Sequence, residues 1–158
     1  MKRRKRTNSN VPAKGRLRDM ADSLWSLAVL GDWNHVCAIC GSRSRLNAHH
    51  LIPRAHYATR YDLRNGICLC SRCHLFCSER SPHQNAAGFM LWRGEHHERL
   101  CQWYTDMMES GEYRDSVVVN AAFLVEVIQA LRENVDESER DRILGVRFSA
   151  WLDSEESR

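Results

Sequence analysis

The chain has 158 residues, of which 43% are hydrophobic and 27% charged, and a formal net charge of +3. This length allows one domain with a real core but not two large ones, and the composition is ordinary for a globular protein. No stretch approaches the roughly 18 apolar residues needed to cross a bilayer, and the basic start lacks the apolar run of a signal peptide. We therefore expect no membrane contact and a cytoplasmic location.

The charges are distributed unevenly along the chain. Residues 1–20 carry a net charge of +7, residues 21–104 carry +3 and residues 105–158 carry −7. A basic start and a mildly basic centre suit a polyanionic partner such as DNA, because each neutralised phosphate releases condensed counterions. DNA would repel the acidic end, so we expect this end to face away from DNA or to bind a protein partner.

Composition also predicts the division of the chain. Residues 1–17 are too charged and polar to bury a core, and we expect a disordered arm. We expect a core domain with a leading helix over residues 18–110 and an acidic helical extension, packed on or beside the core, over residues 111–158. The arm is either a solvated tail or a non-specific contact for phosphates. Its candidate contacts are Lys2, Arg3, Arg4, Lys5 and Arg6.

Hydrophobic spacing and capping residues predict helices around a short hairpin. Ser81 and Pro82 are typical of a helix start, because Ser caps free backbone N–H groups and Pro suits the first helical position. Apolar residues three and four positions apart predict further helices, and two short runs bounded by turn residues predict strands. The expected elements are helices over residues 20–30, 82–93, 96–110 and 116–134, a last helix from about residue 138, and strands over residues 46–52 and 66–69.

Four of the seven cysteines form two Cys-x-x-Cys pairs, and 29 residues separate Cys40 from Cys70. This spacing is typical of a closed tetrahedral zinc site, in which each pair wraps one turn of backbone around the ion. We therefore predict a structural Zn²⁺ bound by Cys37, Cys40, Cys70 and Cys73. His35 is a weaker alternative ligand. The other cysteines are interpreted as small buried hydrophobic residues: Cys68, Cys77 and Cys101.

A second set of polar residues lies between and beside these pairs. It comprises the neighbours His49 and His50, then Asn65 and His74. A zinc clip does not need these residues for its own folding, whereas they can hold a divalent cation and move protons. The pattern resembles the HNH endonuclease family, whose ββα-metal core, or His-Me finger, carries His…Asn…His beside two Cys-x-x-Cys pairs. The resemblance covers roughly residues 24–104.

The resemblance implies an α+β fold, with a ββα-metal core that contains a structural zinc and is flanked by additional α-helices. It implies a nuclease domain within residues 18–110 that hydrolyses DNA phosphodiester bonds and leaves a 5′-phosphate and a 3′-hydroxyl. Leu24-Trp25-Ser26, ahead of the cysteines, is similar to phage-encoded members. A phage-encoded protein would work in the host cytosol.

The family pattern also implies roles for single residues. His50 is the general base that deprotonates water, and an ordinary imidazole pKa of about 6.5 suits this role at neutral pH. His49 and His74 are ligands of the catalytic ion, and Asn65 hydrogen-bonds backbone across the loop to orient the ring of His50. Neighbouring side chains on a strand point to opposite faces, which agrees with separate roles for His49 and His50.

The catalytic ion and its phosphate contacts are less specific. Common members of the family carry Asp at the position of His49. Two imidazoles without a carboxylate weaken the preference for Mg²⁺ and make Mn²⁺, Ni²⁺, Co²⁺ or Zn²⁺ suitable as well. Three arginines between the expected strands are candidate clamps for phosphate: Arg54, Arg60 and Arg64.

One alternative is a zinc-stabilised DNA-binding protein, or an accessory protein for packaging or recombination, that does not cleave. Such a protein has no use for the trio of His50, Asn65 and His74, so cleavage is favoured. We interpret the stripe that contains Trp103 as core. We interpret four other histidines as loop, surface or helix-end residues: His56, His83, His96 and His97.

Overall fold

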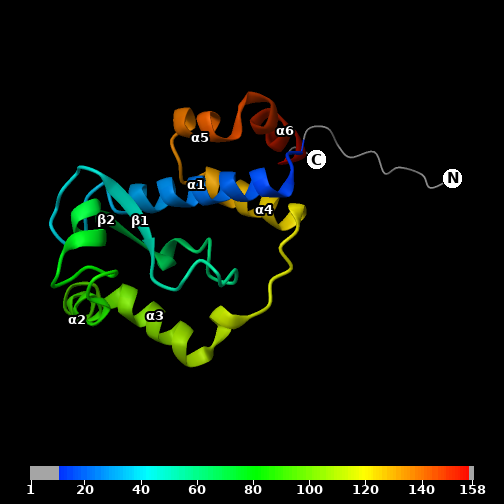
Figure 1. The fold of residues 1–158 in the computed structure, drawn as a ribbon. Coiled ribbons are helices and arrows are strands. Elements are labelled where there is room, and N and C mark those ends of the chain that lie inside the picture. Colours follow the sequence, from blue (N-terminus) through cyan, green and yellow to red (C-terminus); the bar gives the residue numbers. More distant parts are fainter. Residues whose placement is uncertain (1–10, 157–158) are drawn as a thin grey trace. The chain divides into compact units, whose positions relative to one another are not determined.

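The structure of the protein, a computed structural model, describes residues 11–156 (Figure 1). The predicted α+β class is confirmed, since helices accompany one antiparallel pair of strands. None of the helices in residues 11–156 has the length and apolar character needed to cross a bilayer. The elements are α1 (Lys14–Asp32), β1 (Leu46–His50), β2 (Gly66–Cys70), α2 (Ala86–His96), α3 (Glu98–Ser110), α4 (Ala121–Arg132), α5 (Glu137–Leu144) and α6 (Val146–Glu156), with short helical turns at Leu63–Asn65, Arg72–Phe76 and Glu112–Arg114.

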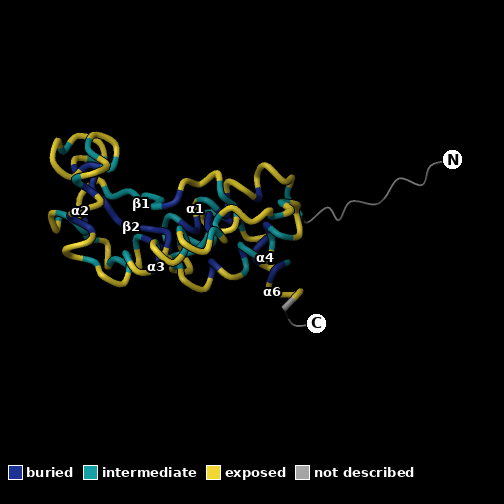
Figure 2. Tube along the Cα trace, turned by 90° about the horizontal axis from the view of Figure 1, so that it is seen from below, coloured by how far each residue is buried: buried dark blue, intermediate teal, exposed yellow. Residues whose placement is uncertain are grey.

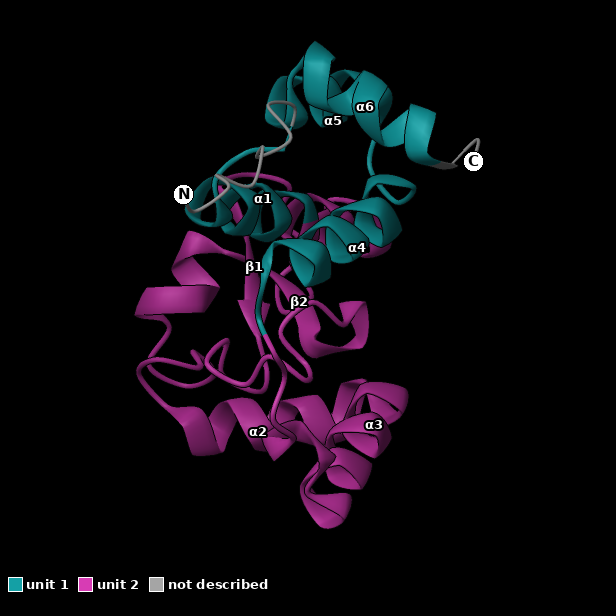
Figure 3. Cartoon of the chain, turned by 90° about the vertical axis from the view of Figure 1, so that its right-hand side faces the viewer, with its two compact units in different colours: residues 1–24, 119–158 teal, residues 25–118 magenta. Residues whose placement is uncertain are grey.

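The chain forms two compact units (Figure 3). The helical unit comprises the residues up to Leu24 and those from Val119 onward, and the sheet unit comprises Trp25–Val118. The division falls within α1, so this helix contributes to both units. The structure thus groups the residues differently from the predicted ranges 18–110 and 111–158.

The sheet unit contains the two antiparallel strands. Their register pairs Leu46 with Cys70 at one end and His50 with Gly66 at the other. Every residue of β2 is buried, whereas every residue of β1 is half-buried (Figure 2). A two-stranded hairpin is marginally stable on its own, so its stability depends on what packs against it.

Helices lie on both faces of this sheet. On one face Ile67 belongs to the same buried cluster as Phe89 of α2. On the opposite face Gly66 lies directly against Val29 of α1. Successive residues of β2 therefore face different helices, as the alternation of side chains along a strand requires.

The first helix begins earlier than the sequence predicts, at Lys14 rather than at residue 20. Leu17 is fully buried and extends the apolar stripe of Met20 and Leu24 by one turn. The expected disordered arm of residues 1–17 is therefore wrong for residues 14–17, which are helical. The basic cluster Lys2–Arg6 lies outside the described residues.

The predicted helix start at Ser81 is also wrong. α2 begins at Ala86, and its N-cap is Asn85, whose Oδ1 accepts a hydrogen bond from the N–H of Gly88 at 2.8 Å. The Oγ of Ser81 instead donates to the carbonyl oxygen of His74 at 2.6 Å. Ser81 therefore holds a turn next to His74. Local hydrogen bonds of this kind, from a serine side chain to the backbone, compete with helix formation.

The helix expected over residues 116–134 is shorter in the structure, since α4 begins at Ala121 and ends at Arg132, with Asn120 as its N-cap. The single helix expected from about residue 138 is divided into α5 and α6 at Gly145, whose φ of +74° lies in the left-handed region. The guanidinium of Arg132 is buried and pairs with Asp153 Oδ1 at 2.8 Å. The buried apolar residues of these helices are Leu124, Ile128, Leu131, Leu144, Phe148 and Leu152.

The close approach of α1 to β2 yields a stability prediction. In Gly66→Ala the new Cβ would lie 2.9 Å from Val29 Cγ1 and even closer to Cγ2. Valine is stiff at χ1, so we expect the free energy of unfolding to fall by about 1–3 kcal/mol in urea denaturation. Gly94→Ala in α2 is the control, because nothing outside its own helix lies within 4 Å. Adding Val29→Ala to the Gly66→Ala variant should recover part of the lost free energy of unfolding. If it recovers none, contact with Val29 is not the cause of the loss.

Candidate active site and metal centre

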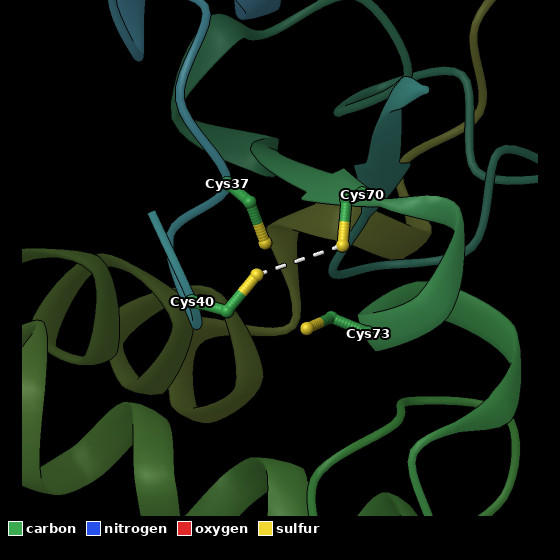
Figure 4. Close-up of side chains that lie close together, drawn as sticks. All are labelled: Cys37, Cys40, Cys70 and Cys73. Carbon is green, nitrogen blue, oxygen red and sulfur yellow. Dashed lines mark hydrogen bonds between the residues drawn. The ribbon is translucent and has the colours of Figure 1, made fainter. Parts of the chain in front are cut away.

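The four cysteines of the two Cys-x-x-Cys pairs converge (Figure 4). Their sulfur atoms all lie within 4.8 Å of one another, and Cys40 Sγ and Cys70 Sγ are 3.7 Å apart. Tetrahedral Zn–S bonds of about 2.3 Å place two sulfur atoms about 3.8 Å apart, so the cluster fits a zinc ion. Burial and the neighbouring thiols of Cys40 and Cys70 raise the pKa of Cys73, as expected where several thiols crowd together.

Backbone hydrogen bonds shape the first cysteine pair. The N–H of Gly41 donates to the carbonyl oxygen of Cys37 at 2.9 Å, and Gly41 has a φ of +72°, which favours glycine. The N–H of Ala38 donates to the carbonyl oxygen of Cys68 in β2 at 2.9 Å. This bond joins the first pair to the strand that ends with Cys70.

A second cluster contains three imidazoles. His49 comes from β1, His74 from the turn Arg72–Phe76, and His83 from the segment before α2. His74 Nε2 lies 3.0 Å from His49 Nδ1 and 3.1 Å from His83 Nε2. A metal bound at about 2.1 Å separates its nitrogen ligands by roughly 3.0–3.4 Å, so these three nitrogens fit one ion.

Hydrogen bonding alone accounts poorly for this cluster. In a neutral imidazole each ring nitrogen carries either one hydrogen or one lone pair, so His74 Nε2 cannot satisfy both close neighbours well. Burial, and then the nearby His74, His83 and His50, lower the pKa of His49 to about 3. Burial and His83 also lower the pKa of His74. Both rings are therefore neutral at physiological pH, the form that binds a metal.

Sequence reasoning missed His83, which it assigned to the surface. The residue is exposed, but the turn at Ser81 directs it toward the cluster. Ser81 Oγ donates to the carbonyl oxygen of His74 and accepts a hydrogen bond from the N–H of His83 at 3.2 Å. The segment Ser81-Pro82-His83 carries the available signal, but a serine before a proline is equally typical of a helix cap.

His50 lies on the other side of β1. Its ring stacks on the indole of Trp25, with ring centres 3.7 Å apart and planes at 12°. Its Nε2 lies 3.0 Å from the carbonyl oxygen of Arg60. A carbonyl can only accept, so Nε2 carries the hydrogen and Nδ1 carries the lone pair of the neutral ring. Trp25 is a second residue whose role sequence reasoning missed.

Asn65 is fully buried and uses its whole amide in hydrogen bonds. Its Oδ1 accepts from the N–H of Ile52 at 2.7 Å, and its Nδ2 donates to the carbonyl oxygens of Ile52 and Thr59, both at 3.0 Å. Thr59 directly precedes Arg60, whose carbonyl oxygen meets the ring of His50. Asn65 thus holds the backbone of the loop whose next carbonyl, that of Arg60, lies at His50 Nε2.

The three loop arginines differ in their surroundings. Arg60 is 7% exposed, its guanidinium lies over the rings of Tyr57 and Tyr61, and its NH1 donates to the carbonyl oxygen of Arg54 at 2.6 Å. These contacts commit the guanidinium of Arg60 to the loop and do not favour its predicted role as a phosphate clamp, which stays a prediction. The side chains of Arg54 and Arg64 are exposed, and Arg64 pairs with Asp62 at 2.6 Å.

The sheet unit thus joins two antiparallel strands and a helical turn to two side-chain clusters that could each hold a metal ion. These features define a ββα-metal protein. Residues 37–76, about a quarter of the chain, match the family model described as HNH endonuclease. The match confirms the resemblance and supports a nuclease-type function in general. Neither the curated proteins nor the solved structures gave a match.

The buried amide yields a second prediction. Asn65→Asp keeps the shape and the acceptor, but it places an oxygen opposite the carbonyl oxygens of Ile52 and Thr59. We expect the free energy of unfolding to fall by about 3 kcal/mol or more, measured by urea denaturation. Asn134→Asp, at an exposed residue, should cost less than about 1 kcal/mol. Equal losses in the two variants would contradict a special role for the Asn65 amide.

Proposed function

We propose that the protein is a metal-dependent DNA endonuclease of the HNH type. The observation that carries this proposal is the arrangement on β1, where two adjacent histidines lie in different surroundings. His49 joins two other imidazoles on one side, while His50 is held on the other side with a lone pair on Nδ1. Phosphodiester hydrolysis needs both a cation site and a base for water.

In the proposed reaction His50 Nδ1 takes the proton of the attacking water. The hydrogen bond from Nε2 to the Arg60 carbonyl stabilises the imidazolium that forms, and the Trp25 stack fixes the plane of the ring. Asn65 is a positioning residue that holds the loop carrying this carbonyl. Because these contacts exist before substrate binds, the base needs little reorganisation during the reaction.

Two ions are proposed. A structural zinc would be bound by the cysteine cluster and would stabilise the fold. A divalent ion at His49, His74 and His83 would supply positive charge against the phosphate oxygens and the departing 3′ oxygen. The donor set contains three imidazoles, which suits Mn²⁺, Co²⁺, Ni²⁺ or Zn²⁺ at least as well as Mg²⁺.

Further parts of the proposal concern partners and source. Arg54 and Arg64 are exposed beside the site and are proposed to contact DNA phosphates, together with the basic residues Lys2–Arg6. The acidic helices of residues 111–158 are proposed to bind a protein partner. A phage origin and work in the host cytosol remain proposals from the resemblance. The family match does not favour the alternative of an accessory protein without cleavage.

Cleavage is tested with supercoiled plasmid and the purified protein in Mg²⁺, Mn²⁺ or Ni²⁺. His50→Ala should lower the rate of nicking about 10²–10⁴-fold, because it removes the base, while DNA affinity measured by anisotropy stays nearly constant. His35→Asn is the control: His35 is exposed, and Asn tolerates its φ of +53°. A His50→Ala variant that nicks as fast as the parent would refute the assignment of the base.

The two metal sites are separated by elemental analysis and calorimetry. We expect about one zinc per purified chain, lost together with cooperative unfolding in Cys73→Ser but kept in Cys101→Ser. His83→Ala should keep the zinc and weaken Mn²⁺ or Ni²⁺ binding by about 10–100-fold or more, since loss of even an outer-shell partner has that effect. Unchanged Mn²⁺ and Ni²⁺ affinity in His83→Ala would remove His83 from the site.

A further inference from the structure

A cavity of about 570 Å³ lies in the sheet unit beside the start of α3. Its volume falls within the range of roughly 300–1,000 Å³ that is typical of ligand sites. The walls combine aromatic rings, guanidinium groups and an aliphatic side chain, and Glu98 also lines it. The residues that characterise the cavity are Trp33, Arg64, His97, Arg99, Leu100 and Trp103.

The aromatic walls are held in fixed positions. Trp33 and His97 meet edge to face with ring centres 5.0 Å apart. The guanidinium of Arg64 lies over the ring of Trp103 at 5.7 Å, and Asp62 binds this guanidinium through two of its nitrogens. Flat surfaces of this kind suit a flat aromatic ligand.

One polar atom of this wall lacks a partner. Trp103 is 8% exposed, and its Nε1 makes no hydrogen bond to any of residues 11–156. A buried indole N–H usually has an acceptor, because leaving it unpaired costs free energy. A ligand in the cavity whose carbonyl oxygen or ring nitrogen reached this atom would satisfy the donor.

One wall of the cavity contacts the strand that pairs with β1. The indole N–H of Trp33 donates to the carbonyl oxygen of Gly66 at 3.2 Å. Gly66 is the residue that pairs with His50 across the sheet. Directly opposed residues in an antiparallel sheet have Cα atoms about 4.5–5.5 Å apart. This contact links one wall of the cavity to the strand that pairs with His50.

We propose that this cavity binds an unpaired nucleobase of the DNA substrate, so that the protein prefers DNA with a bulged or single-stranded base over intact duplex. The proposal rests on the proposed nuclease function and deepens it. Stacking on tryptophan and arginine planes binds bases of any sequence. The base offers acceptors to Trp103 Nε1, and the guanidinium groups of Arg64 and Arg99 attract the flanking phosphates.

The test measures binding without added divalent cation, so it does not depend on cleavage. Full-length protein is titrated with two fluorescently labelled duplexes of equal sequence, one fully paired and one with a single bulged 2-aminopurine. The parent should bind the bulged duplex about tenfold more tightly than the paired duplex and change its 2-aminopurine fluorescence. Stacking of one base and one hydrogen bond together contribute enough binding free energy for a tenfold difference in affinity. Trp103→Phe, which keeps a ring but removes the N–H, should reduce the preference several-fold.

Trp151→Phe is the matched control, because Trp151 stacks on Phe148 in the helical unit and is not one of the residues that line the cavity. It should keep the full preference. If Trp103→Phe does not fold, as judged by thermal unfolding, Arg99→Gln decides, because Arg99 is exposed and loss of a guanidinium plane that lines the cavity should weaken binding of the bulged duplex more than binding of the paired duplex. Equal affinity of the parent for both duplexes, or an undiminished preference in the folded variants, would overturn the proposal. Plasmid nicking without this preference would leave the nuclease function standing and reject the base pocket alone.

Discussion

The sheet unit depends on four cysteine side chains that converge at one end of its two-stranded sheet. Such a hairpin buries too little surface to be stable alone. The cysteine cluster ties the segment before β1 to the end of β2 and to the turn that follows, and the backbone bond from Ala38 to Cys68 adds to this link. Since the strands are short, fixing one end also fixes the register at the other end, where His50 pairs with Gly66.

Much of this arrangement could be predicted from the sequence because it depends on spacing. Two Cys-x-x-Cys pairs at a given separation predict a four-thiol cluster whatever surrounds them. Alternation along a strand predicts that His49 and His50 face different sides, and the structure places His49 near Phe89 of α2 and His50 on Trp25 of α1. Both inferences need only local geometry, which the sequence carries directly.

The remaining features could not be predicted, because they depend on contacts between distant residues. Trp25 lies 25 positions before His50, and no spacing rule relates an indole on a helix to a ring on a strand. His83 reaches the imidazole cluster because Ser81 binds the backbone at His74, whereas the same serine before proline is typical of a helix start. The charge of Arg60 predicts a phosphate contact, whereas its guanidinium is buried over the rings of Tyr57 and Tyr61.

The proposed base and the imidazole cluster are held with different rigidity. The loop beside His50 is secured by the buried amide of Asn65, the buried guanidinium of Arg60 and the indole N–H of Trp25, which donates to the carbonyl oxygen of Asp62 at 3.1 Å. His83 is exposed and is fixed through a single serine turn. Buried, multiply bonded groups open less readily than exposed turns. The ring of His50 is therefore preorganised by the fold, whereas the imidazole cluster can adjust through one of its three members without disturbing the sheet.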